Sequence, residues 1–173
     1  MPESYLITGG QRSGKSLHAE QLALSLSENP LYLATSVPAD DDFRERVRKH
    51  QERRGPNWTT IEEPIHLSLH ADQMSNRVVL VDCITLWLTN IFFSTDAGMN
   101  VDKSFEIARK EIDALLDLPV SFIFVTNEIG LGGVSMDATQ RHFTDLQGLV
   151  NQYIASKVCH VTLLVSGIPV KVK

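Results

Sequence analysis

The chain carries Gly9-Gly10-Gln11-Arg12-Ser13-Gly14-Lys15-Ser16 near its start, and this stretch decides the fold. It matches the pattern G-x-x-x-x-G-K-[ST] without deviation. Residues 5–8 before it predict a strand, and residues 16–27 after it carry apolar side chains at helical spacing. Glycines between a strand and a helix let successive backbone N–H groups point at phosphate oxygens, and the helix N-terminus adds positive potential. The stretch therefore predicts a P-loop that holds the phosphates of a nucleotide.

Three side chains are predicted to act on those phosphates and on a magnesium ion. Lys15 would reach the β- and γ-phosphates, and the hydroxyl of Ser16 would bind Mg²⁺. A P-loop also needs an acid at the end of a neighbouring strand, and Asp82 directly follows the apolar run at residues 78–81. Asp82 would hold Mg²⁺ directly or through a water molecule. The alternative is that Asp82 caps a helix that begins at residue 84.

Short β-branched runs alternate with helical segments along the whole chain, which is typical of a parallel sheet with helices on both faces. Strands are predicted at residues 5–8, 31–35, 58–61, 77–82, 121–126, 161–165 and 170–172, and helices at 16–27, 40–54, 65–73, 84–93, 102–116 and 139–157. The length of 173 residues fits one domain with one core. We therefore expect a single α/β P-loop domain over residues 1–173, with its site at the carboxyl ends of the strands.

The composition argues against several classes of protein. The net charge of −5 and the pI near 5.6 disfavour a nucleic-acid binder, which is usually basic. No apolar run approaches the roughly 18 residues of a membrane span, and residues 1–5 do not begin a secretory signal. Cys83 and Cys159 lie in or beside apolar runs and lack metal-ligand spacing. We expect both to be reduced core residues of a cytoplasmic protein.

The predicted helix at residues 40–54 concentrates positive charge in an otherwise acidic chain. Six of the 16 lysines and arginines fall between residues 44 and 54. Acidic neighbours at helical spacing explain some of them as a solvated helix face. His50, however, shares one face with Phe43 and Val47. It is either a core histidine or a nucleophile, because a neutral imidazole attacks phosphorus well and flanking cations would offset the negative charge.

Further segments match one known family in order over nearly the whole chain. The matching pieces are residues 7–16 with 19–20, YLATS at 32–36, residues 40–41 with RVRKH at 46–50, WTTIE at 58–62, VDCIT at 81–85 with 89–90, VTNEIG at 125–130, 141–143 with 145, VNQ at 150–152 and VSG at 165–167. Together they resemble the bifunctional adenosylcobinamide kinase / adenosylcobinamide-phosphate guanylyltransferase family. The resemblance implies a RecA-like P-loop subunit that assembles as a homotrimer.

The resemblance also implies two reactions of cobalamin synthesis. The first phosphorylates the aminopropanol hydroxyl of adenosylcobinamide with ATP or GTP. The second takes GMP from GTP, joins it to the new phosphate to give adenosylcobinamide-GDP, and releases pyrophosphate. Family members carry out the second reaction through a guanylylated histidine. That role falls on His50, because it is the histidine of the Arg-Val-x-x-His pattern; the other histidines, His18, His66, His70, His142 and His160, do not match it.

By the same match, a set of residues would contact the guanine nucleotide. They are Gly9, Gly10, Gln11, Arg12, Ser13, Gly14, Lys15, Ser16, Ala34, Thr35, Ser36, Gln51, Glu52, Arg53, Arg54, Glu62 and Asp82. The chain departs from the family at Asp82, where glutamate is frequent. The shorter side chain reaches about one methylene less far, which still allows it to bind Mg²⁺ through a water molecule.

Asn127 and Glu128 follow the strand predicted at residues 121–126, where groups that contact the substrate would lie; alternatively, Glu128 caps the loop after it. Two other functions stay open from the residues alone. One is a P-loop kinase for another small molecule, in which His50 is structural. The other is a RecA-like regulatory NTPase that acts on nucleic acid, against which the acidic pI argues. The sequence also leaves open whether one P-loop serves both reactions.

Overall fold

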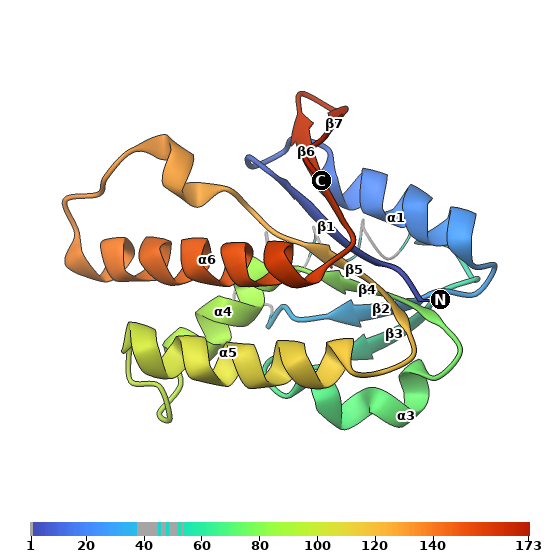
Figure 1. The fold of residues 1–173 in the computed structure, drawn as a ribbon, viewed down its shortest axis with the longest axis horizontal. Coiled ribbons are helices and arrows are strands. Elements are labelled where there is room, and N and C mark those ends of the chain that lie inside the picture. Colours follow the sequence, from blue (N-terminus) through green and yellow to red (C-terminus); the bar gives the residue numbers. More distant parts are fainter. Residues whose placement is uncertain (1, 38–44, 46–47, 49–51, 53) are drawn as a thin grey trace.

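The computed structural model describes residues 2–37, 45, 48, 52 and 54–173. Within these residues, seven strands form one sheet in the order β3-β2-β4-β5-β1-β6-β7 (Figure 1). All neighbours run parallel except β7, which pairs antiparallel with β6. The strands are β1 (Ser4–Gly9), β2 (Leu31–Ala34), β3 (Thr59–Glu62), β4 (Val78–Asp82), β5 (Ser121–Val125), β6 (His160–Val165) and β7 (Ile168–Lys171).

Helices connect the strands and cover both faces of the sheet. They are α1 (Lys15–Leu26), α3 (Ala71–Met74), α4 (Ile84–Phe92), α5 (Val101–Leu116) and α6 (Ala138–Lys157), with short 3₁₀ helices η1 (Leu67–His70) and η2 (Ile129–Gly132). The α/β alternation predicted from the sequence is confirmed, with most ends shifted by a residue or two. The helix predicted at residues 40–54 lies mostly outside the described residues, although 45, 48, 52 and 54 are helical.

One predicted helix, at residues 65–73, is split into η1 and α3. The carboxylate of Glu63 accepts hydrogen bonds from the backbone N–H groups of Ile65 and His66, at 2.9 and 2.8 Å. A side chain that satisfies these donors competes with the helical hydrogen bonds. The helical segment therefore begins at Leu67 as the 3₁₀ helix η1, and regular α-helix follows only from Ala71.

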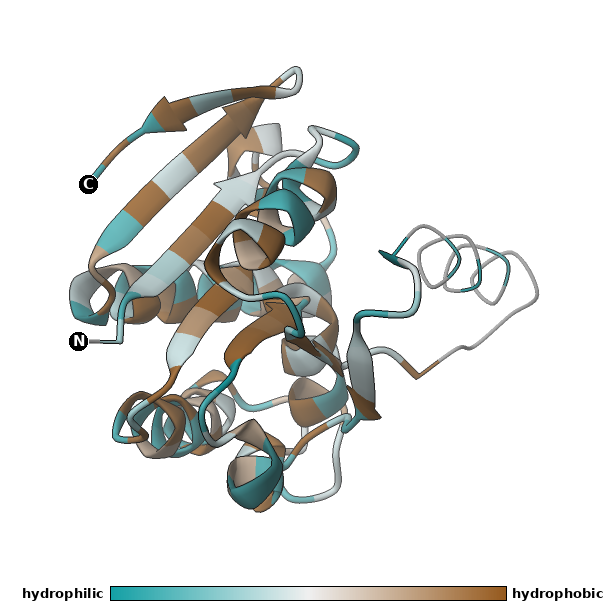
Figure 2. Ribbon diagram, turned by 90° about the vertical axis from the view of Figure 1, so that its right-hand side faces the viewer, coloured by the Kyte–Doolittle hydropathy of each residue, from teal (hydrophilic) through white to brown (hydrophobic). Residues whose placement is uncertain are grey.

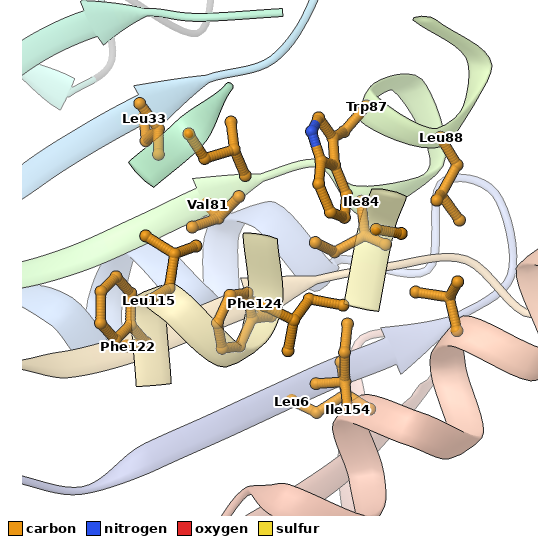
Figure 3. Packing of buried hydrophobic residues seen from close by; sticks show 14 of the residues in the cluster. Leu6, Leu33, Val81, Ile84, Trp87, Leu88, Leu115, Phe122, Phe124 and Ile154 are labelled. Carbon is orange, nitrogen blue, oxygen red and sulfur yellow. The ribbon is translucent and has the colours of Figure 1, made fainter. Parts of the chain in front are cut away.

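Side chains of the central strands alternate between two packed layers, as the pleat requires. Leu6 and Phe122 belong to the larger core, which the strands form with α4, α5 and α6. Their neighbours Ile7 and Ile123 belong to a smaller core against α1. Figure 2 shows the hydrophobic segments concentrated in the strands at the centre of the sheet. Figure 3 shows Phe122 and Phe124 of β5 packed in the larger core.

Trp87 of α4 is fully buried in the larger core beside Ile84 (Figure 3). Its indole N–H donates to the carbonyl of Ile65 at 2.8 Å, which ties α4 to the segment after β3. The expectation for the cysteines is only half confirmed. Cys83 is buried, but Cys159 is exposed because it lies just before β6, at the rim of the sheet.

None of the helices in the described part of the chain is long and apolar enough to cross a membrane.

Candidate nucleotide and phosphoryl-transfer site

The strand register brings the predicted site residues to one edge of the sheet. Glu62, Ala34 and Asp82 lie side by side on β3, β2 and β4. Asp82 is also level with Val125 of β5, and Val125 with Ile7 of β1. The eight-residue loop begins two positions beyond Ile7, so it leaves the sheet at this same edge. Because the strands are parallel, segments far apart in the sequence converge here, as expected for a site at the carboxyl ends.

The loop adopts backbone conformations that suit a phosphate cradle. Gly9, Arg12 and Gly14 have φ values of 150°, 56° and 95°. The N–H of Ser13 donates to the carbonyl of Gly10 at 3.3 Å, which closes a tight turn. Helix α1 begins immediately afterwards, so the loop leads into the positive end of a helix dipole.

The turn between β6 and β7 supports this loop from the side. The N–H of Gly167 donates to the carbonyl of Ser13 at 2.9 Å. A Cβ at Gly14 would lie 3.3 Å from the Cα of Gly167, so the two backbones approach closely. Ser166 and Gly167 both have positive φ, at 51° and 84°, as a type I′ hairpin turn requires. A Ser-Gly pair between β-branched runs signals such a turn, but the contact of this turn with the loop could not be predicted from the sequence.

Lys15 is buried at the centre of the site. Its ammonium donates to the carbonyl of Gly10 at 2.5 Å and lies 3.5 Å from the hydroxyl of Ser13. Burial lowers the pKa of Lys15, and the charges nearby, Cys83 and Asp82, raise it less. Burial, followed by the charge of Asp82, raises the pKa of the Cys83 thiol to about 12, so this thiol is neutral at neutral pH. Of these two neighbours, only Asp82 then carries a negative charge near Lys15. The fold has thus brought the P-loop lysine within electrostatic reach of the strand-end acid.

Asp82 is connected to a second cation through Tyr32. The phenol of Tyr32 donates to Oδ2 of Asp82 at 3.1 Å. Burial, and then Asp82, raises the pKa of this phenol, which keeps it protonated as a donor. The guanidinium carbon of Arg54 lies 3.5 Å from the centroid of the same ring, a cation–π contact. Nη1 of Arg54 is buried and has no hydrogen-bond partner among the described residues.

The alternative role of Asp82 as a helix cap is wrong. The cap position of α4 is Cys83, not Asp82, and the side chain of Cys83 makes no capping hydrogen bond. The hydroxyl of Ser16 and the carboxylate of Asp82 are both oxygen donors at the carboxyl edge. This donor set fits Mg²⁺, which binds proteins through few side-chain oxygens and takes substrate phosphates as further ligands.

Thr35 was expected to contact the nucleotide, but its side chain already has two partners within the protein. Its hydroxyl donates to the carbonyl of Cys83 at 2.8 Å and accepts from the N–H of Cys83 at 2.9 Å. Asn90 donates to the Thr35 carbonyl at 2.7 Å. Thr35 therefore holds the end of β2 against the start of α4.

Replacing Thr35 by valine is expected to lower the free energy of unfolding by about 2 kcal/mol, because the buried N–H of Cys83 loses its partner, whereas the carbonyl of Cys83 still accepts from the N–H of Trp87. The matched control is Thr35→Ser, which keeps the hydroxyl and should cost about 1 kcal/mol for the lost methyl group. Urea denaturation of both variants measures the difference. Equal stability of the valine and serine variants would contradict this assignment.

The remaining predicted residues divide between the site edge and the surface. Ala34 and Ser36 are half-buried at the end of β2, while Gln11, Arg12 and Glu62 are exposed. Glu52 is exposed and accepts a hydrogen bond from Arg48 at 2.6 Å on the helix surface. His50, Gln51 and Arg53 lie outside the described residues.

Asn127 and Glu128 follow β5, the strand between β1 and β4. Glu128 occupies the cap position of η2 but makes no capping hydrogen bond, so the alternative role as a side-chain cap is wrong. Its carboxylate instead accepts from the hydroxyl of Thr8 at 2.7 Å. The side-chain amide of Asn127 donates to the hydroxyl of Thr85 at 2.9 Å, at the start of α4. Both residues therefore lie between the P-loop and Asp82.

Known proteins with similar sequences identify the family. The family model described as cobinamide kinase / cobinamide phosphate guanyltransferase, CobU, matches residues 5–172. The bifunctional adenosylcobalamin biosynthesis protein CobU of Escherichia coli (strain K12) is 39% identical over 179 residues, which cover 97% of this chain and 98% of that protein. The bifunctional protein CobP of Pseudomonas aeruginosa is 38% identical over 170 residues, covering 97% and 96%.

Solved structures show the fold independently of the sequence. An ATPase from the type III secretion system of pathogenic bacteria matches with a TM-score of 0.60 and 12% identity, over 94% of this chain and 51% of that one. At this identity the likeness shows a RecA-like P-loop fold and nothing more. With the family match over nearly its whole length, the chain belongs to the cobinamide kinase / cobinamide phosphate guanylyltransferase family, the bifunctional enzymes of adenosylcobalamin biosynthesis.

Proposed function

We propose that this chain carries out both reactions of its family at the carboxyl edge of the sheet, with ATP or GTP in the kinase step and GTP in the guanylyl transfer. The observation that carries the proposal is the burial of Lys15 within reach of Asp82. A buried ammonium is stabilised by negative charge, and a triphosphate supplies that charge where the loop directs its N–H groups. Adenosylcobinamide would be the acceptor in the first reaction and its phosphate the acceptor in the second.

The guanylyl transfer would pass through His50, as the family pattern implies. A ring nitrogen of His50 attacks the α-phosphorus of GTP, the bond from that phosphorus to the β-phosphate oxygen breaks, and pyrophosphate leaves. A phosphate oxygen of the acceptor then attacks the same phosphorus, and the bond to nitrogen breaks. Arg54, held over the ring of Tyr32 next to Asp82, is a cation that could offset charge on the transferred group.

Magnesium would be held by Ser16 and Asp82 together with phosphate oxygens. When bound, it neutralises charge that develops on those oxygens during transfer. The protein's own groups would orient the phosphates before the reaction. These groups are the side chains of Lys15 and Arg54 and the backbone N–H groups of the loop.

Incubation with GTP labelled at the α-phosphate with ³²P tests the proposal. The wild-type protein should acquire a label that is labile in acid and stable in alkali, as a bond between phosphorus and nitrogen is. The variant His50→Ala should acquire none. His142→Ala is the matched control, because His142 is exposed on α6 and does not match the family pattern. A wild-type protein that forms adenosylcobinamide-GDP without any label would show that no covalent intermediate exists.

We place the enzyme in the cytoplasm, where its nucleotide substrates are available, and propose the homotrimer that the family resemblance implies. The antiparallel edge supports an interface between copies, because Ile168, Val170 and Val172 are exposed apolar side chains at alternate positions. Sedimentation equilibrium measures the mass of the assembly in solution. A monomeric mass would contradict the homotrimer but would not contradict the two proposed reactions.

A further inference from the structure

Glu128 occupies the position where an acceptor would approach the P-loop. Strand β5 separates β1 from β4, so the chain that follows it emerges between the P-loop and Asp82. The backbone N–H of Glu128 donates to the carbonyl of Gly9 at 3.2 Å, next to the first residue of the loop. The side chain remains half-exposed at this edge. A carboxylate is therefore held beside the cradle without being part of it.

Two buried donors orient the carboxylate, and both reach the same oxygen. Oε1 accepts from the hydroxyl of Thr8 at 2.7 Å and from Nδ2 of Asn151 at 3.3 Å. Thr8 and Asn151 are only 6% and 7% exposed. Among the described residues, no hydrogen bond to Oε2 is found, so the network holds one oxygen and leaves the other to a further partner.

The amide of Asn151 is itself held in one orientation. Its Oδ1 accepts from the hydroxyl of Thr126 at 2.7 Å and from Nε2 of Gln147 at 3.0 Å. Its Nδ2 must therefore face the opposite way, where it donates to the carbonyl of Asn127 at 3.1 Å and to Glu128. A rotated amide would place an oxygen against two acceptors, which buried networks avoid. The chain of donors thus fixes where the Glu128 carboxylate lies.

This arrangement is unusual for a structural glutamate. A partly buried carboxylate that only supports the fold commonly pairs with a cation. The ion pairs found among the described residues do not include Glu128. The donors that hold this carboxylate, Thr8 and Asn151, are neutral, and they bind Oε1.

We propose that Glu128 is the general base of the kinase step, with Thr8 and Asn151 as positioning residues. The inference rests on the proposed function. The hydroxyl oxygen of the acceptor bonds to the γ-phosphorus, and the bond from that phosphorus to the bridging oxygen breaks. The hydroxyl proton passes to Oε2 of Glu128, and the nucleoside diphosphate leaves.

The two reactions need this base to different extents, because their acceptors differ. An alcohol carries a proton that must be removed as its oxygen bonds to phosphorus. In the second reaction, the histidine attacks through a lone pair and the acceptor phosphate is already ionised. Glu128 is therefore a residue for the kinase step alone, although both steps use the same edge of the sheet.

The variant Glu128→Gln tests the assignment, because the amide oxygen can still accept from Thr8 while the base is lost. We expect kcat for phosphorylation of adenosylcobinamide to fall about 10²-fold. Formation of the ³²P-guanylyl protein, and its discharge to adenosylcobinamide phosphate supplied ready-made, should change less than about 3-fold. Thermal unfolding with and without GTP verifies that the variant folds and binds the nucleotide.

Thr8 provides the test of positioning, with a matched pair of variants. Thr8→Val removes the donor to Oε1 and should lower the kinase kcat by about 10-fold, and Thr8→Ser should restore it. A merely structural role of the network would lower both reactions together in Glu128→Gln, and that outcome overturns the proposal. So does a Glu128→Gln kinase rate equal to that of the wild type. Wild-type protein without kinase activity would instead contradict the proposed function.

Discussion

Replacing Lys15 by methionine is expected to lower kcat/KM for both reactions by about 10³-fold or more. The ammonium lies against the carbonyl of Gly10 and is buried within reach of Asp82. Methionine fills similar volume without the charge, so the loop keeps its shape but loses its attraction for phosphate. Both steps use a triphosphate, and both should therefore fail together.

The stability of the same variant separates binding from folding. Because burial lowers the pKa of Lys15, the folded protein binds this proton less tightly than the unfolded chain. The charged lysine therefore lowers the free energy of unfolding at neutral pH. For the wild type, this free energy rises again as the pH increases from the lowered pKa of the folded state to the usual pKa of the unfolded chain. We expect Lys15→Met to unfold at a temperature no lower than wild type, and GTP to stabilise only the wild type.

The matched control is Lys110→Met, a change at an exposed lysine on α5. It should leave both activities and the stabilisation by GTP as in the wild type. Activity of Lys15→Met within about 10-fold of the wild type would show that the lysine does not hold the transferred phosphates.

Replacing Gly9 by alanine is expected to lower the free energy of unfolding by about 3 kcal/mol or more and to remove nucleotide binding. Gly9 has a φ of 150°, and a Cβ there would lie 2.6 Å from the carbonyl oxygen of Leu164 and 2.8 Å from the hydroxyl of Ser13. The first contact is with the backbone of β6, the strand paired with β1, so neither partner can move without breaking the sheet.

Gly10 is the matched control for stability, since it has no positive φ and a Cβ there would meet no atom within 4 Å. Gly10→Ala should change the free energy of unfolding by less than about 1 kcal/mol, because alanine at an unstrained position costs nothing in contacts. Urea denaturation of the two variants measures the contrast. Similar free energies of unfolding for the two variants would mean that β1 and β6 can move apart at Gly9 to accept a Cβ, which would contradict this prediction.

The sequence by itself determined the elements whose causes are local. The P-loop is eight consecutive residues, so its motif could be recognised before any contact was known. The apolar run at residues 78–81 predicted a strand, and Asp82, which follows the run, lies at the edge that the loop shares. The start of the predicted helix at residue 65 was wrong, because the carboxylate of Glu63 binds the N–H groups of Ile65 and His66 and the helical segment begins only at Leu67.

Only the tertiary structure decided which residues these elements meet. Thr35 was expected to contact the nucleotide, but its hydroxyl is paired with Cys83, 48 positions away. The partners of Asp82 and Glu128 were not predicted either: Tyr32 lies 50 positions from Asp82, and Thr8 lies 120 positions from Glu128. Such contacts depend on strand order and register, which bring distant segments side by side. A local pattern determines what a segment is, whereas the sheet that joins β1, β4 and β5 determines what its side chains can do.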